Sequence, residues 1–325
     1  MKINIFFDYT ASSYGGGNQF LKALRNELIS TGCFEEDPKE ANGILFNSHH
    51  HLDDIIRLKR KFIDKVFVHR VDGPMSYRGI DGEKIDRKIF YLNKIVADGT
   101  VFQSEWSRFE SQKQGMKNNR FETIIRNASD SNIYYPVNSN HEKSGSRKIK
   151  LITTSWSSNP GKGFDIYHYL DNNLDFRKYE MTFVGQSERK FNNIRMVPPV
   201  SSIELAGHLR KHDIFVFASK REACSNSLIE ALTCGLPAVV RNCSSNPEVI
   251  SDNGLIFDGK DDVLTKIKAV ADNLDYYSKK LNIHGIKEVT ENYCQFFETV
   301  FTNIRDGVYR AKRVGFLEFM MLKTI

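Results

Sequence analysis

The feature that most constrains this chain is an alternation of short apolar segments with amphipathic segments, which occurs twice along the sequence. In the first half, five apolar segments have the length of strands, and between them apolar residues recur at the helical spacing. Strands that are joined through helices pair in parallel, with right-handed crossovers. The expected strands of this half are Ile3–Asp8, Gly43–Asn47, Lys65–Arg70, Thr100–Ser104 and Glu122–Asn127.

A polar segment, Pro136–Lys148, interrupts the alternation and has the Pro, Gly and Ser content of a linker. Beyond it the alternation starts again, and after Asp261 the pattern is helical. The expected strands of the second half are Ile149–Ser155, Glu180–Gly185, Asp213–Ser219, Pro237–Asn242 and Gly254–Phe257.

The sequence therefore predicts an α/β protein with two tandem, Rossmann-like, doubly wound domains that face a cleft, followed by a helical C-terminal tail. A length of 325 residues also favours two domains over a single core. We place the N-terminal domain at residues 1–140, the second domain at 141–305 and the tail at 306–325. Open α/β sheets bind ligands at the carboxyl ends of their strands, so functional residues are expected directly after strands.

The formal net charge of +6 favours anionic partners such as phosphorylated metabolites, nucleic acid or an acidic membrane surface. The five cysteines are an odd number without a C-x-x-C pair, which argues against a disulfide framework or a structural zinc site. No apolar run approaches the roughly 20 residues that span a bilayer. We therefore expect a cytoplasmic protein, and the absence of an aromatic and basic stripe argues against nucleic acid.

The segment KREACSNSLIEALTCGLPAV, Lys220–Val239, has the layout of a helix that starts just after a strand and stops at a Gly and a Pro. Ser225 is a suitable N-cap for this helix. The first amides of a helix lack partners within it, and the helix dipole adds partial positive charge there. The sequence therefore predicts a phosphate or diphosphate site at the amides of Asn226, Ser227 and Leu228.

Two glutamates flank this predicted site, Glu222 in the loop before the helix and Glu230 about one turn inside it. A nucleotide-sugar matches the layout, because its ribose hydroxyls and its sugar hydroxyls lie on opposite sides of the diphosphate. A carboxylate that accepts from vicinal hydroxyls makes strong, charge-assisted hydrogen bonds. The spacing alone is equally consistent with a loop charge at Glu222 and a solvated helix residue at Glu230.

Six segments carry a wider pattern in a fixed order along both predicted domains. They are YGGGNQFLKALRNEL, VHRVDGP, IIRNASDSNIYYP, TTSWSSNPGKGFD, the E-x7-E pair followed by CGLP, and NPEVISDNGLIF. On these segments the chain resembles the retaining nucleotide-sugar glycosyltransferases of the GT-B fold, in the large family four. The third segment departs from the family in having a Tyr where a Phe is usual.

The resemblance implies a role for each matching residue. Glu222 is similar to the glutamate that holds the donor sugar near the reacting carbon, and Glu230 to the one that binds the ribose hydroxyls. Lys162 corresponds to the lysine that neutralises the diphosphate. His69 corresponds to the histidine that faces the sugar from the N-terminal domain.

The resemblance also implies a phosphate or acceptor loop at Gly16, Gly17 and Asn18, whose glycines allow a close backbone approach. One family position differs, because Ser157 stands where an Arg usually precedes the lysine by five residues. The phosphate contact of that Arg is then either missing or supplied from elsewhere, such as Arg221. A second departure is Ala128-Ser129 in place of Gly-Val.

Three other patterns have competing interpretations. FFDYTASSYGGGNQF contains Gly15 and Gly17 of a dinucleotide fingerprint, but Phe20 occupies the third glycine position. His49–His51 and the two Asp that follow suggest a metal cluster, yet they lack paired ligand spacing, and a surface or cleft-edge cluster is favoured. The basic and apolar tail YRAKRVGFLEFMML either lies on an anionic membrane or packs on the N-terminal domain, and we favour packing.

The predicted function is a retaining glycosyltransferase that moves a sugar from a nucleoside diphosphate sugar to a glycan or lipid-linked acceptor, as in surface polysaccharide synthesis. No D-x-D occurs, so we expect no metal or other cofactor, with the amides and Lys162 carrying the phosphate charge. The basic and apolar tail leaves open an association of the protein with the inner face of a membrane. Two alternatives remain: a nucleotide-sugar epimerase, which needs no acceptor, and a non-catalytic nucleotide-sugar or glycan-binding protein.

Overall fold

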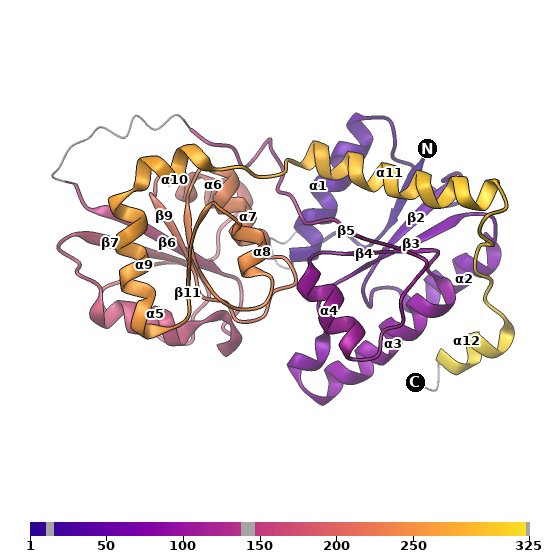
Figure 1. Ribbon diagram of the computed structural model, residues 1–325, viewed down its shortest axis with the longest axis horizontal. Coiled ribbons are helices and arrows are strands. Elements are labelled where there is room, and N and C mark those ends of the chain that lie inside the picture. The colour runs from indigo at the N-terminus through magenta and orange to yellow at the C-terminus, as the bar shows by residue number, and fades with distance from the viewer. Residues whose placement is uncertain (11–15, 138–146, 323–325) are drawn as a thin grey trace. The chain divides into compact units, whose positions relative to one another are not determined.

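The computed structural model describes residues 1–10, 16–137 and 147–322, and these residues form two compact units, each with its own sheet (Figure 1). Of the described residues, unit 1 contains 1–10, 20–127 and 286–322, and unit 2 contains 16–19, 128–137 and 147–285. Gly15 and residues 138–146 of the predicted linker lie outside the described residues.

In unit 1 the described strands form one parallel sheet in the order β1-β2-β3-β4-β5. Four of the five are apolar runs that are buried almost throughout, as parallel strands covered on both faces must be. The strands are β1 (Ile3–Phe6), β2 (Gly43–Asn47), β3 (Val66–Val71), β4 (Gly99–Phe102) and β5 (Phe121–Ile124).

The chain adds neighbours to β1 first on one edge and then on the other, while all the strands stay parallel. It leaves β1 through α1 (Gly16–Ser30) and then pairs Phe34 with Ile3 in an isolated parallel bridge. The N–H and C=O of Ile3 bond to Cys33 and Glu35, so β2 pairs with the opposite edge of β1. Such a change of edge opens a crevice for ligands beyond the carboxyl ends of the strands.

Helices cover both faces of the unit 1 sheet. On one face Phe20 of α1 contacts Tyr293 of α11 (Ile286–Arg305), with 6.1 Å between ring centroids. On the other face α2 and α3 pack on Ile44 and Phe46 of β2. The helices that follow β2, β3 and β4 are α2 (Leu52–Lys61), α3 (Ile80–Val96), with the short 3-10 helix η1 (Met75–Arg78) before it, and α4 (Glu105–Lys113).

Helix α11 belongs to unit 1, whereas the sequence placed residues 286–305 in the second domain. Its Phe297 is fully buried against the sheet. A Cβ on Gly43 would lie 2.6 Å from Cδ1 of Phe297, and one on Gly99 would lie 2.9 Å from Cε1 of Phe296. The two glycines therefore leave the space that the aromatic side chains of α11 occupy.

The predicted tail contains α12 (Phe316–Leu322), which packs against α3 in unit 1. The Tyr91 hydroxyl donates to the carbonyl oxygen of Glu318 at 3.3 Å, and Phe319 joins the apolar cluster under α2 and α3. Within the described part of the chain, no helix combines the length and the apolarity needed to cross a membrane.

In unit 2 the described strands form a parallel sheet in the order β11-β10-β9-β6-β7-β8. Counted in chain order within the unit, this is the 3-2-1-4-5-6 arrangement of dinucleotide-binding folds, with its switch point between β6 and β9. The strands are β6 (Ile149–Ser155), β7 (Tyr179–Gly185), β8 (Arg195–Val197), β9 (Ile214–Phe217), β10 (Ala238–Arg241) and β11 (Gly254–Phe257).

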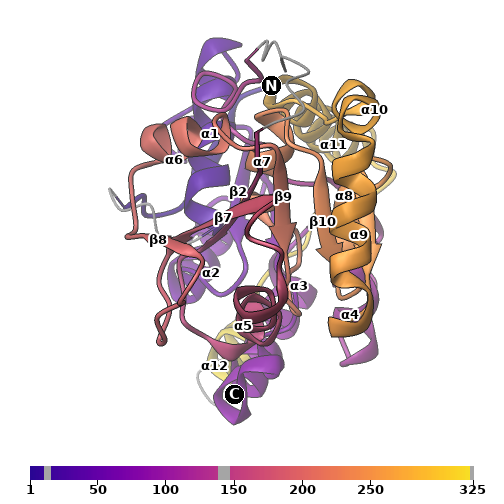
Figure 2. The same cartoon turned by 90° about the vertical axis from the view of Figure 1, so that its left-hand side faces the viewer.

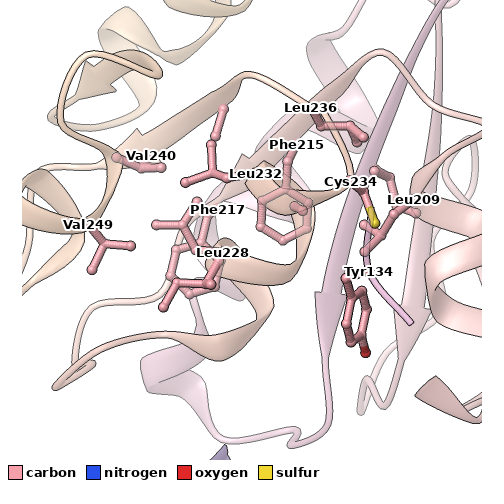
Figure 3. Packing of buried hydrophobic residues seen from close by; sticks show 14 of the residues in the cluster. Tyr134, Leu209, Phe215, Phe217, Leu228, Leu232, Cys234, Leu236, Val240 and Val249 are labelled. Atoms are coloured by element: carbon pink, nitrogen blue, oxygen red, sulfur yellow. The ribbon is translucent and has the colours of Figure 1, made fainter. Parts of the chain in front are cut away.

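Two apolar clusters hold the unit 2 sheet between helices. One cluster joins β6, β9 and β10 to α6, α7 and α8, and Figure 3 shows Phe215 and Phe217 of β9 packed on Leu228 and Leu232 of α7. The other joins the opposite face to α5 and α9 (Figure 2). The helices are α5 (Phe164–Asn173), α6 (Ser202–Leu209), α7 (Asn226–Thr233), α8 (Asn246–Ile250), α9 (Lys260–Asp272) and α10 (Leu274–Lys280).

The predicted fold class, two parallel-sheet α/β domains with a helical C-terminal region, is confirmed. Each of the ten predicted strands overlaps an observed strand. Strand β8, at the exposed edge of the unit 2 sheet, was not predicted.

Candidate functional site

The loop between β9 and α7 carries Glu222, the first glutamate of the E-x7-E pair, at the switch point of the unit 2 sheet, and α7 carries the second, Glu230. Helix α7 begins at Asn226, as predicted, and the hydroxyl of its N-cap Ser225 accepts from the Leu228 amide at 3.4 Å. The same hydroxyl lies 3.0 Å from the Ser227 hydroxyl. Because the cap engages the Leu228 amide, this amide is a weaker candidate for an anion than the sequence suggested.

Glu230 is a buried residue of α7, with 6% of its surface exposed. Burial raises the pKa of its carboxyl to about 8, and a hydrogen bond from Tyr134 opposes that rise. The ring of Tyr134 packs at the edge of the apolar cluster, near Leu209 and Cys234 (Figure 3). The alternative of a solvated helix residue at Glu230 is therefore wrong.

Glu222 contacts two groups from neighbouring loops. Its Oε1 lies 2.6 Å from Lys162 Nζ and 2.6 Å from the hydroxyl of Ser219. Its backbone is also fixed, because its amide donates to Ser244 Oγ at 3.0 Å and its carbonyl accepts from Ser245 Oγ at 2.8 Å. Glu222 and Lys162 are 60 residues apart in sequence, and the fold brings them into one ion pair.

Lys162 ends the short 3-10 helix η2 (Pro160–Lys162), just before α5. The next residue, Gly163, has φ +86°, and a Cβ there would lie 2.2 Å from the carbonyl oxygen of Ala218. The Lys220 amide donates to the Gly161 carbonyl at 2.8 Å. The loops that carry Lys162 and Glu222 are thus joined through their backbones, and a glycine is required at this contact.

A cavity of about 500 Å³ lies at the carboxyl ends of β7 and β8, and sequence reasoning did not find it. Five of its nine lining residues are Ser, Gly or Pro. Gly185, which ends β7, has φ +128°, and its turn lets Gln186 N donate to Ser155 O at 2.8 Å. The lining residues are Ser158, Gly185, Gln186, Ser187, Glu188, Met196, Val197, Pro198 and Pro199.

The positions that departed from the family pattern have local roles. The Ser157 carbonyl accepts from the Ser155 hydroxyl at 2.7 Å, and the Ser157 hydroxyl accepts from the Asn159 amide at 3.2 Å. Ser157 therefore shapes the turn that leads to Lys162. Arg221 is exposed, directly before Glu222.

In unit 1, His69 lies inside β3 and has no exposed surface. Its Nδ1 lies 3.2 Å from Asn93 Nδ2 and its Nε2 lies 3.0 Å from the Ser48 carbonyl oxygen, so the ring accepts at one nitrogen and donates at the other. It stacks on Phe46, and burial lowers the pKa of the imidazole to about 4. This neutral, fully bonded side chain fixes Ser48, and the geometry does not support the predicted contact with a sugar.

Gly16, Gly17 and Asn18 form the first turn of α1, and Asn18 is 5% exposed. Their predicted role as a phosphate or acceptor loop stays a prediction. His49 and His50 stack with 4.6 Å between ring centroids, beyond the end of β2. Within the described residues, no group of three or more His, Cys, Asp or Glu side chains has a geometry that would hold a metal.

A buried arginine organises the carboxyl ends of the unit 1 strands. Arg70 has no exposed surface, and its guanidinium donates to Asn47 Oδ1 at 2.5 Å and to Asn127 Oδ1 at 2.7 Å. It also donates to Asp72 Oδ1 at 3.1 Å, and Gln103 donates to the same carboxylate. The Asp72 side chain is 33% exposed, so it is the member of this network that reaches solvent.

A family model described as "Glycosyl transferases group 1" matches residues 170–274, which lie in unit 2. No curated protein matches the sequence. The matching residues include α7 and both loops on either side of it, and this match together with the fold indicates an enzyme of the glycosyltransferase class.

Several solved structures have the same fold. Sucrose-phosphate synthase from Thermosynechococcus elongatus is 13% identical with a TM-score of 0.65, over 94% of this chain and 98% of that one. Anabaena HepE, solved with UDP-glucose, is 14% identical with a TM-score of 0.65, over 95% and 99%. A glycosyltransferase from Rickettsia africae is 14% identical with a TM-score of 0.62, over 91% and 85%.

Proposed function

We propose that this chain is a retaining, metal-independent glycosyltransferase that transfers a sugar from a nucleoside diphosphate sugar to a glycan or lipid-linked acceptor, as in surface polysaccharide synthesis. The observation that carries the proposal is the convergence of Lys162, Glu222 and Ser219 at the start of the α7 loop, with Glu230 on the helix that follows. A cation and a carboxylate thus pair at the switch point of a dinucleotide-type sheet, where such folds bind their ligands, and the next helix carries a second carboxyl group.

The cavity beside β7 and β8 supports a nucleotide as part of the donor. It has the size range of small-molecule sites and lies on the same edge of the sheet as the Lys162 loop, which contributes Ser158 to its wall. A wall in which small residues and prolines predominate leaves room for a flat base. Because HepE was solved with UDP-glucose, uridine diphosphate sugars are the first donors to test.

Each site residue then has one part in the chemistry. Lys162 binds the diphosphate, whose negative charge grows as the glycosidic bond breaks, so its attraction is strongest in the transition state. Glu222 holds the sugar hydroxyls and Glu230 the ribose hydroxyls. Retention follows from attack on the face that the diphosphate leaves, with the diphosphate taking the acceptor proton. His69 has no part in this scheme, because both of its nitrogens are bonded within unit 1.

Glu222 is the partner of Lys162, with 2.6 Å between Oε1 and Nζ. An incoming diphosphate carries more negative charge than one carboxylate and competes for the same ammonium. Once Lys162 turns to the phosphates, the Glu222 carboxylate becomes available to sugar hydroxyls while Ser219 still holds it. The ion pair thereby links occupation of the phosphate site to release of the sugar-binding group.

The test is an assay of nucleoside diphosphate release from a panel of nucleotide-sugars, with and without glycan and lipid-linked acceptors. We expect acceptor-dependent release, and proton NMR of the product should show the anomeric configuration of the donor. Acceptor-independent conversion of the sugar would support the epimerase alternative. Tight donor binding without turnover on any acceptor would support the binding-protein alternative, and an inverted product would refute retention.

A further inference from the structure

Helix α12 presents an apolar face to solvent. Four large apolar residues share one side of its seven residues, at the i, i+1, i+4 and i+5 positions. Figure 1 shows α12 near the C-terminus. They are Phe316, Leu317, Met320 and Met321, with exposed fractions of 64%, 77%, 45% and 54%. No other helix among the described residues concentrates as many exposed large apolar side chains.

The opposite side of α12 is firmly packed, so the exposed face has a fixed position on unit 1. Phe319 joins the apolar cluster of α2 and α3, and the Arg60 guanidinium lies 5.4 Å from the centre of its ring. Tyr91 of α3 donates to the Glu318 carbonyl. Met321 also faces α3, because its Sδ lies 3.7 Å from the Tyr91 hydroxyl, whereas Phe316 and Leu317 are the most exposed of the four side chains.

The segment before α12 is anchored to a buried carboxylate. The Lys312 amide donates to Asp98 Oδ1 at 2.8 Å, and Lys312 Nζ donates to the Asn93 carbonyl at 3.2 Å. Asp98 has no exposed side-chain surface, and its other oxygen lies 2.6 Å from the buried Lys59 Nζ. This connection fixes where α12 begins and keeps its apolar face turned outward.

Basic residues lie on the segments next to α12. Arg60 and Lys61 belong to the last turn of α2, beside Phe319, and Lys88 and Lys94 lie within one turn of Tyr91 on α3. Arg313 precedes α12 and is exposed. Asp53 and Asp54 of α2 and Asp81 and Glu83 of α3 lie in the first turns of their helices, and the buried Asp86 accepts from the Met75 and Ser76 amides. Glu318 of α12 accepts from the Gly315 amide at 2.7 Å. The face therefore combines apolar side chains with a surplus of positive charge.

We propose that the exposed face of α12, with the basic residues on the segments next to it, binds the surface of an anionic lipid membrane. An apolar helix face flanked by Lys and Arg is the arrangement of helices that lie in the interface plane of a bilayer. Apolar side chains enter the headgroup boundary while each nearby basic residue adds roughly fivefold to binding on an anionic leaflet. The proposal concerns a surface distant in sequence from the donor site and does not depend on the reaction.

A second copy of this chain is a poorer occupant. Pairing the same face of two chains would bring the basic residues of both together, and like charges across an interface oppose association. The patch is also small, because α12 has seven residues and a stable interface uses about 20–30 residues a side. A membrane presents opposite charge and an apolar interior in one surface.

The test is cosedimentation with vesicles of phosphatidylcholine alone and of an equimolar mixture with phosphatidylglycerol. We expect binding to the anionic vesicles that weakens as salt is raised, and little binding to the neutral ones. Leu317→Asp or Phe316→Asp should weaken binding about tenfold or more. The matched control is Phe109→Asp, since Phe109 on α4 of unit 1 is also a helical phenylalanine, with 62% of its surface exposed.

A charge test uses Lys88→Glu with Lys94→Glu, compared with Lys260→Glu and Lys279→Glu on exposed positions of unit 2. The first pair should reduce binding to anionic vesicles, and the second pair should leave it unchanged. Circular dichroism melts show whether each variant is folded. The proposal is overturned by equal binding to neutral and anionic vesicles, by an equal effect of Phe109→Asp, by no sedimentation, or by concentration-dependent dimers that Leu317→Asp abolishes.

Discussion

Replacing Glu230 by Gln removes a carboxyl group whose protonation the fold controls, and the consequence can be calculated. Burial in α7 raises the pKa of this carboxyl from 4.5 to about 8. At pH 7 about 0.9 of the molecules then carry the proton, from the difference of about one unit between pH and pKa. Ribose hydroxyls that donate to an ionised Glu230 must displace this proton, so nucleotide binding at pH 7 should release about 0.9 proton.

Calorimetric titration of uridine diphosphate in buffers of different ionisation enthalpy measures this release directly. Wild-type affinity should rise up to about tenfold per pH unit below pH 8 and level off above it. Glu230→Gln should release no proton from this site and should bind more weakly at pH 9, by roughly 1.5–3 kcal/mol for the lost charged partner. Taking the difference between the two proteins cancels the titration of the ligand's own phosphate near pH 6.

Protein stability gives an independent test with a definite sign. The folded-state pKa of Glu230 is raised, so the protonated carboxyl favours the folded state. This contribution to the unfolding free energy is complete below about pH 4.5 and is lost as the pH rises through about 8. At about 1.36 kcal/mol per unit, the wild type should lose up to about 5 kcal/mol of unfolding free energy relative to Glu230→Gln across this window. Urea unfolding at pH 5 and pH 9 measures the change. Parallel stability profiles, together with no proton release, would refute both the buried acid and the ribose contact.

Substitutions at the other site residues should differ in whether they affect donor binding or the transfer step. Lys162→Ala should lower kcat more than it raises the donor KM in steady-state assays, and a larger effect on KM would contradict transition-state binding. Glu222→Gln frees Lys162 from its partner, so calorimetry should show uridine diphosphate bound at least as well as by the wild type, while transfer falls by about 10². A chelator should leave turnover intact, and inhibition that manganese or magnesium reverses would contradict metal independence. Gly163→Ala should cost at least about 1–3 kcal/mol in thermal or urea unfolding, because φ is +86° and Ala218 O would lie 2.2 Å from the new Cβ; an unchanged melt would contradict the required contact.

The strands were predictable because parallel strands buried on both faces are short, continuous apolar runs. Strand β8 was not, since Arg195–Val197 is a three-residue edge strand with two exposed residues and no apolar run. Helix α11 shows a different limit. Its stripe of Tyr293, Phe297 and Val300 is visible in the sequence, but nothing in the stripe says which sheet it covers. What places α11 on the unit 1 sheet is the space left by Gly43 and Gly99, which lie far from α11 in the sequence.

The site was predictable where the chemistry lies within one segment. Ser225, the start of α7 and the placement of both glutamates follow from capping and periodicity. The pair of Lys162 with Glu222 joins residues 60 apart and needs the switch point of the sheet. His69 lies in the strand where the sequence placed it, and its contact with a sugar stays a prediction. Ligand-binding residues lie beyond strand ends, and His69 is inside the buried strand Val66–Val71.

The Tyr that replaces the family's Phe was visible in the sequence, but its consequence was not. Tyr134 packs its ring in the apolar cluster, as a Phe would, and brings a hydroxyl to the buried carboxyl of Glu230. The two glutamates of one motif therefore have different neighbours: Glu222 has an ammonium at 2.6 Å, and Glu230 has a phenol inside an apolar surround. Two residues of the same type, eight positions apart, therefore have different surroundings. The Glu222 carboxylate pairs with a lysine from another loop, and the Glu230 carboxyl lies in the apolar core. Donor binding through Glu230 should therefore strengthen as the pH rises toward about 8.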